Sequence, residues 1–168
     1  NGGAGDQGIV YGYAIDNQYN HLPYGVYLSN LIAKEIDKYR KKIDYLLPDG
    51  KVQVTINENQ IEQLVINVQH KKEVSPNFIE NEIKQNVLSQ LIDCECVNIQ
   101  INKNSEFYNG GFINDTGLTG RKIMIDTYGG LVTHGGGAFS GKDPSKIDRS
   151  AAYMARFVAK NIVANGLE

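Results

Sequence analysis

Two runs of alternating apolar and polar residues constrain the fold of this chain more than any other feature. The apolar positions are Val52, Val54 and Ile56 in the first run and Leu64, Ile66 and Val68 in the second. Alternation with a period of two places the apolar side chains of a β-strand on one face. The polar residues at 57–60 separate the runs, so we expect a β-hairpin with one buried face.

Three other segments repeat their apolar residues every three or four positions, which predicts amphipathic helices. The first extends from about Pro23 to Lys42. In the second, Ser75 is the predicted N-cap and Pro76 the first helical residue. The third begins at Asp148, ends near Ala164 and is stopped by Gly166. Its predicted buried stripe consists of Ala152, Ala155, Ala159, Ile162 and Val163.

Shorter runs predict additional strands near residues 8–14, 96–101 and 122–127. The order of elements predicts an α+β fold, a two-layer α/β sandwich with a mixed or antiparallel sheet and helices on one face. We expect one domain over residues 1–108 and the beginning of a second over 109–168. This second part holds a strand, a loop and a helix, which cannot bury their own apolar faces well. We therefore expect another chain, or sequence outside this one, to complete it.

Composition excludes several classes of protein. Hydrophobic residues make up 41% of the 168 residues, which argues against disorder. The net charge of -2 argues against a general nucleic-acid binder, and no apolar run is long enough to span a membrane. The cysteines, Cys94 and Cys96, have few histidines to join them in a metal site, so we expect two reduced thiols in a cytoplasmic protein.

A glycine-rich segment at 134–144 carries the strongest chemical signal. From Gly136 to Lys142 it fits the pattern G-x-x-x-x-G-K, but Asp143 stands where a P-loop has serine or threonine, and Pro144 interrupts the helix that should follow. It is therefore not a P-loop. Its glycines still allow backbone N–H groups to approach a polyanion, and its lysine supplies positive charge.

Asp148 follows this segment at the start of the third helix. A carboxylate beside a phosphate would repel it unless a divalent cation lay between them, so the composition predicts a metal-bridged polyphosphate. The alternative is a flexible glycine linker with solvated charges. Phe139 within the segment, and the helix after it, argue against this alternative.

Three weaker motifs surround acidic or basic residues. Residues 115–122 form a turn that ends in Arg121 and Lys122, and an ordinary polar turn is an equally good interpretation. Glycines flank Asp6 at residues 3–8, and Asp49-Gly50-Lys51 is a common turn sequence. None of the three predicts a site by itself.

Together and in this order, these segments resemble methionine adenosyltransferase (S-adenosylmethionine synthetase), specifically its central domain and the beginning of its C-terminal domain. The resemblance rests on residues 3–8 with 11–14, on 117–122 with 126–130, and on 135–146 with 148–153. Residues 17–95 match mainly through their pattern of elements and through Pro48-Asp49-Gly50-Lys51. An unrelated phosphate-binding module would have to match three motifs in family order by accident.

The resemblance implies a reaction in which the sulfur of L-methionine attacks C5′ of ATP, and the leaving triphosphate is hydrolysed to pyrophosphate and phosphate. It also implies Mg²⁺ and K⁺ as cofactors and an active site between the subunits of a homodimer or tetramer. The family's N-terminal part has no counterpart here, so we expect a fragment that is inactive alone. The alternative is a short non-catalytic regulatory subunit, or a nucleotide-binding partner of a full-length enzyme.

The resemblance further implies individual site residues. ATP-binding positions fall on Asp49, Gly50, Lys51, Phe107, Asp115, Arg121, Lys122, Ala138 and Lys142. Methionine-binding positions fall on Asp6, Asp115 and Lys146, a Mg²⁺ ligand on Asp148, and catalytic positions on Lys142, Arg121, Lys146 and Asp115. Phe107 would stack on adenine. The family's arginine before it is Glu106 here, which would be unfavourable beside ATP unless only the backbone takes part.

Overall fold

The computed structural model describes residues 5–103 and 106–167, so the first two residues of the motif at 3–8 lie outside the described residues. The chain forms two compact units. Residues 27–116 form one, which we call the sheet unit. The two ends of the chain, up to residue 26 and from residue 117, form the other, which we call the terminal unit. Each unit is described by itself.

The sheet unit is built on the predicted hairpin. Strands β1 (Leu46–Asn57) and β2 (Gln60–His70) pair antiparallel, and β3 (Asn98–Ile101) pairs parallel to β2. Glu58 and Asn59 connect β1 to β2 with positive φ angles of 48° and 66°, the conformation of a type I′ hairpin turn. The register places Val52 opposite Ile66, so apolar side chains of both strands share one face.

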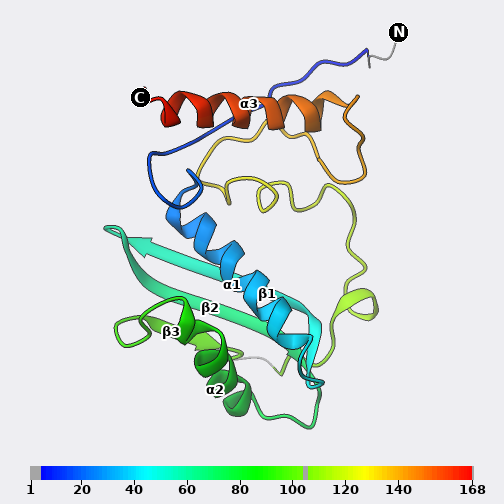
Figure 1. Ribbon diagram of the computed structural model, residues 1–168. Helices are drawn as coiled ribbons and strands as arrows, with labels where there is room; N and C mark the ends of the chain where they lie inside the picture. The colour runs from blue at the N-terminus through cyan, green and yellow to red at the C-terminus, as the bar shows by residue number, and fades with distance from the viewer. Residues whose placement is uncertain (1–4, 104–105, 168) are drawn as a thin grey trace. The chain divides into compact units, whose positions relative to one another are not determined.

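Helices α1 (Tyr24–Arg40) and α2 (Pro76–Asn86) cover one face of this sheet (Figure 1). The predicted N-cap is confirmed, because the Ser75 side chain accepts a hydrogen bond from the Phe78 N–H at 3.3 Å. A short 3-10 helix, η1 (Leu88–Gln90), follows α2. The core between the layers consists mainly of Leu28, Ile32, Leu64, Ile66, Ile79, Ile83, Leu88 and Ile101. The α+β fold with a mixed sheet is therefore confirmed.

One carboxylate links the two helices of the sheet unit to the start of the sheet. Glu82 of α2 accepts hydrogen bonds on Oε2 from Tyr39 of α1 and from Tyr45, the latter at 2.5 Å. These two bonds lower the pKa of Glu82 below its usual range. The cluster adds charge-assisted hydrogen bonds to the aromatic contact between Tyr45 and Phe78, whose ring centroids lie 5.4 Å apart.

Helix α3 (Ile147–Ala164) is the main element of the terminal unit, and its end matches the prediction. Gly166 has a φ of 72° and donates to the Val163 carbonyl at 3.0 Å, while Leu167 donates to the Ile162 carbonyl at 3.2 Å. This pair of bonds is a Schellman motif, in which glycine takes the left-handed position that ends the helix. No helix in the described ranges is long and apolar enough to cross a membrane.

Two predicted strands of the terminal unit are wrong. Residues 8–14 are extended, but they pair with no strand among the residues that the structure describes. Their polar backbone groups bond to side chains instead: the Tyr13 N–H donates to the Tyr128 hydroxyl at 3.0 Å, and the Tyr13 carbonyl accepts from Arg156 at 2.5 Å. Residues 122–127 form turns, because their N–H groups are used locally, as in the 3.0 Å bond from Asp126 to the Lys122 carbonyl.

The predicted buried stripe of α3 is only partly correct. Ala152 is buried, and Ala155, Ala159 and Val163 are half-buried. Ile162 is 44% exposed and was wrongly assigned to the stripe. The small alanines face the extended N-terminal segment closely: a Cβ added at Gly12 would overlap the Ala155 carbonyl. Close backbone approach, and not a broad aliphatic layer, holds this helix face.

Candidate active site

The glycine-rich segment at 134–142 is anchored to α3 by an aromatic side chain. The Phe139 ring packs edge-on against Tyr153 of α3, with ring centroids 5.6 Å apart, and lies 6.1 Å from the His134 ring. The Gly136 N–H donates to His134 Nδ1 at 2.8 Å. These contacts give the segment a defined path, which argues against a flexible linker.

Lys142 and Asp148 form an ion pair at the start of α3. Lys142 Nζ lies 2.5 Å from Asp148 Oδ2, and both side chains are about 30% exposed (32% and 27%). Arg149 Nη1 donates to the Lys142 carbonyl at 2.5 Å. A carboxylate in the first turn of a helix is also favoured by the positive end of the helix dipole. One predicted phosphate-binding cation therefore neutralises the predicted metal ligand.

Gly137 allows the glycine-rich segment to lie directly against this ion pair. A Cβ added at Gly137 would overlap the Asp148 carboxylate, and one added at Gly8 would lie 3.6 Å from Asp148 Oδ1. Glycines from two segments far apart in sequence thus surround one acidic side chain. The arrangement explains why both motifs are rich in glycine at these positions.

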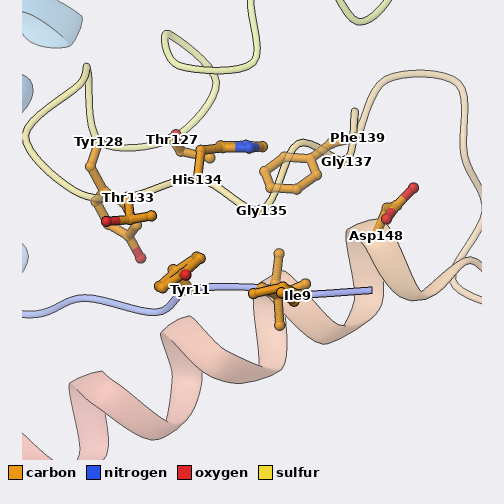
Figure 2. Close-up of a pocket in the computed structure, with 12 residues that line it drawn as sticks. Ile9, Tyr11, Thr127, Tyr128, Thr133, His134, Gly135, Gly137, Phe139 and Asp148 are labelled. Carbon is orange, nitrogen blue, oxygen red and sulfur yellow. The ribbon is translucent and has the colours of Figure 1, made fainter. Parts of the chain in front are cut away.

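Figure 2 shows the hollow between the glycine-rich segment and the N-terminal segment. Ile9 and Tyr11 line one side, and Tyr128, His134 and Phe139 line the other. Its volume of about 20 Å³ suits a single water molecule. The hollow is therefore too small for adenine or for methionine in this conformation.

The turn before Lys122 meets the glycine-rich segment. A Cβ added at Gly120, whose φ is 83°, would lie 3.0 Å from the Ala138 Cβ. Arg121 and Lys122 follow with exposed side chains, and Lys146 is also exposed, donating to Ser145 Oγ at 3.3 Å. The predicted site residues in the terminal unit are Asp6, Arg121, Lys122, Ala138, Lys142, Lys146 and Asp148.

Asp143, which stands in the P-loop hydroxyl position, belongs to the turn that leads into α3. Its Oδ1 accepts a hydrogen bond from the Ser145 N–H at 2.8 Å. Hydrogen bonds from the Ser145 side chain and backbone lower the pKa of Asp143. The residue therefore orders the entry to the helix, a role that a P-loop serine does not have.

The other predicted site residues belong to the sheet unit: Asp49, Gly50, Lys51, Phe107 and Asp115. Asp49 Oδ2 accepts a hydrogen bond from the Gly111 N–H at 3.0 Å, and the Phe107 carbonyl accepts one from the His70 N–H at 2.9 Å. Lys51 is exposed on β1 opposite Asn67, and Glu106 is exposed. Asp115 follows the short 3-10 helix η2 (Gly111–Ile113).

The residues present fit a metal ion only in part. Among the described residues, no group of at least three histidine, cysteine, aspartate or glutamate side chains could hold one. Mg²⁺ often binds proteins through one or two carboxylates and takes its remaining ligands from water and substrate phosphates. Asp148 suits that mode, because Gly8 and Gly137 bring no Cβ against its carboxylate, whose paired side chain is Lys142. Asp148 would be one protein ligand of such an ion, and a bound polyphosphate and water would have to supply the others.

Sequence reasoning missed the residues that hold these segments in place. Arg156 Nη1 donates to the carbonyls of Tyr13 and His21, and its Nη2 donates to the Asn20 carbonyl at 2.7 Å. The guanidinium also lies 6.0 Å from the centre of the Tyr128 ring. The only available signal was a single arginine on an otherwise apolar stretch of helix, which does not specify a partner.

Two family models match this chain. One, described as the S-adenosylmethionine synthetase central domain, matches residues 1–117. This chain belongs to the S-adenosylmethionine synthetase family. The second model, described as the C-terminal domain of the same enzyme, matches residues 109–168. The central-domain match precedes the C-terminal-domain match along the chain, and together the two matches cover all 168 residues.

Proposed function

We propose that this chain forms one wall of the site in which an S-adenosylmethionine synthetase joins ATP to L-methionine. The observation that carries the proposal is the Lys142–Asp148 pair beside Gly137, with Gly120 against Ala138. This arrangement combines backbone N–H groups, a cation and a carboxylate in one place. Such a combination suits a polyphosphate with a bound divalent cation.

The chemistry explains why positive charge gathers at this wall. A thioether is a weak neutral nucleophile, so positioning and leaving-group stabilisation must supply most of the catalysis. The methionine sulfur forms a bond to C5′, the C5′–O bond breaks, and its electron pair leaves with the triphosphate. Lys142, Arg121 and Lys122 would bind the oxygens of that group. Water then cleaves triphosphate to pyrophosphate and phosphate.

Lys142 would change partner during binding. When its ammonium group donates to a phosphate oxygen, Asp148 loses its counter-charge and becomes available as a metal ligand. Asp148 would then hold Mg²⁺, which would supply positive charge to stabilise the leaving triphosphate. K⁺ belongs to the proposal through the family resemblance, and no residue of this chain is assigned to it.

The remaining substrate contacts follow the family resemblance. Asp6, Asp115 and Lys146 would bind methionine, with the acidic groups near its ammonium. Phe107 would stack on adenine, and Asp49, Gly50 and Lys51 would reach the nucleotide. Asp115, Arg121, Lys142 and Lys146 are the proposed catalytic residues. We further propose a cytoplasmic enzyme whose site lies between subunits of a homodimer or tetramer, so that the isolated chain does not turn over.

Calorimetric titration of the 168-residue chain with inorganic triphosphate and Mg²⁺ tests this proposal. Lys142→Ala is expected to weaken triphosphate binding by at least about tenfold, because it removes a cation from a partly buried site. Lys41→Ala removes one exposed cation from the turn directly after α1, in the sheet unit, and should change the affinity by less than about twofold.

Equal affinity in the wild-type chain and the Lys142→Ala variant would contradict the assignment of Lys142, and absence of binding in the wild-type chain would contradict the proposed site. An assay for S-adenosylmethionine accompanies the titration. Turnover by the isolated chain at the rate of a complete enzyme would refute its proposed inactivity.

A further inference from the structure

A short backbone segment, residues 107–111, is fixed to the hairpin by three hydrogen bonds. The His70 N–H donates to the Phe107 carbonyl at 2.9 Å, and Gln69 Nε2 donates to the Tyr108 carbonyl at 3.2 Å. The Gly111 N–H donates to Asp49 Oδ2 at 3.0 Å. The segment is therefore held at its first two residues by β2 and at its last residue by Asp49 of β1.

Gln69 occupies the centre of this arrangement. It is only 9% exposed, and its Oε1 lies 3.4 Å from the Asp49 N–H, so one side chain links β1 to the segment. A Cβ added at Gly110 would lie 2.8 Å from Gln69 Cδ and 3.0 Å from Asp49 Oδ2. Gly110 has an extended φ of −151°, which any residue can adopt. Glycine is needed there for space, because the segment packs directly on the Gln69 amide.

The fixed segment begins with one proposed ligand-binding residue, and its last residue is hydrogen-bonded to another. Phe107, which would stack on adenine, is its first residue. At its other end, the Gly111 carbonyl accepts hydrogen bonds from Asn114 at 3.0 Å and from Asp115 at 2.8 Å. A shift of the segment would therefore move both an adenine-binding ring and a methionine-binding carboxylate.

We propose that Gln69 is a positioning residue for the ATP site. Its amide holds the Tyr108 carbonyl, directly after Phe107, and packs against Gly110, so it acts with His70 and Asp49 to set the position of the Phe107 ring. The expected effect on ATP affinity rests on the proposed function. The positioning of the backbone of residues 107–111 follows from contacts within the sheet unit alone. The neighbouring Gly110 preserves the space that the amide requires.

Two ligands separate this role from a general loss of structure. Gln69→Ala should weaken ATP binding by about tenfold, because the backbone directly after the adenine-facing Phe107 loses the hydrogen bond from Gln69 to the Tyr108 carbonyl. Inorganic triphosphate has no adenine, so its affinity should change by less than about twofold. Gln69→Glu keeps the size of the side chain but cannot donate to the Tyr108 carbonyl, and it should resemble Gln69→Ala. Gln63→Ala, on the same strand, is the matched control.

A double variant tests the packing directly. Gly110→Ala should weaken ATP binding in the wild-type background, and part of that loss should disappear in the Gln69→Ala background, where the Cβ no longer meets the amide. Hydrogen exchange of the Gly111 amide provides a readout independent of ligands. We expect faster exchange in Gln69→Ala and wild-type exchange in Gln63→Ala.

The outcomes are distinct. Unchanged ATP affinity in Gln69→Ala, or equal losses for ATP and triphosphate, would overturn the positioning role. If the wild-type chain binds neither ligand, the proposed function fails, and exchange at Gly111 alone decides: faster exchange in Gln69→Ala supports the positioning of the segment, and unchanged exchange overturns it.

Discussion

Replacing Arg156 with methionine is expected to destabilise the terminal unit by about 3 kcal/mol, because hydrogen bonds from a charged donor contribute about 1.5–3 kcal/mol each and are not fully additive. The guanidinium binds the carbonyls of Tyr13, Asn20 and His21, and methionine offers no donor to any of them. Burial lowers the pKa of Arg156, yet an arginine remains cationic at neutral pH. We expect the N-terminal segment to detach from α3.

Urea unfolding and hydrogen exchange of residues 5–22 measure this effect. Lys160→Met is the matched control on the same helix, because Lys160 makes one exposed bond, to Asn20 Oδ1 at 2.8 Å. It should cost less than about 1 kcal/mol. Equal stability of the two variants, with unchanged exchange in residues 5–22, would show that Arg156 does not hold the segment.

Gly135→Ala is expected to separate the glycine-rich segment from the N-terminal segment. A Cβ at this position would overlap the carbonyl oxygen and carbon of Ile9, and both are backbone atoms that cannot rotate away. Forcing extra volume into a packed contact costs about 1–3 kcal/mol. Because Gly135 leads into the segment that ends at Lys142, triphosphate affinity should fall as well.

Gly8→Ala provides the comparison for this variant. Its Cβ would meet nothing closer than 3.6 Å, so it adds the same methyl group in ordinary contact. We expect its unfolding curve, followed by circular dichroism, to match that of the wild-type chain. If Gly135→Ala unfolds at the same urea concentration as Gly8→Ala, the close packing of residues 9 and 135 is wrong.

Local sequence signals were sufficient for the sheet unit. Alternation between Val52 and Val68 gave the hairpin, and Ser75-Pro76 gave the beginning of α2, because these patterns depend on strand and helix periodicity alone. Neither pattern depends on which distant segment packs nearby. The same holds for the end of α3, where Gly166 takes the left-handed conformation.

The terminal unit was harder to predict because its backbone groups bond to distant side chains. Residues 8–14 have the composition of a strand. However, the backbone N–H and carbonyl of Tyr13 bond to the side chains of Tyr128 and Arg156 in place of a neighbouring strand. Nothing in the local sequence reveals these partners, which lie more than a hundred positions away. Ile162 was wrongly predicted to be buried for a related reason: α3 packs through its alanines directly against the backbone of the N-terminal segment.

For the candidate site, the motifs identified the family but did not predict that the charged side chains of the site pair with one another. The sequence placed Lys142 and Asp148 near a polyphosphate in separate roles. In the structure they neutralise one another at 2.5 Å, and the hollow beside them has a volume of only about 20 Å³. Such a pairing depends on side-chain conformations that residue spacing does not determine.

The central claim is that the glycine-rich segment binds a polyphosphate, and amide chemical shifts of the ¹⁵N-labelled chain test it most directly. Titration with inorganic triphosphate and Mg²⁺ should cause saturable shifts at the amides of Gly136, Gly137, Gly141 and Lys142. The basic residues at the end of α1 should give no saturable response. Shifts confined to those residues, or an unchanged spectrum at the glycine-rich segment, would contradict the claim.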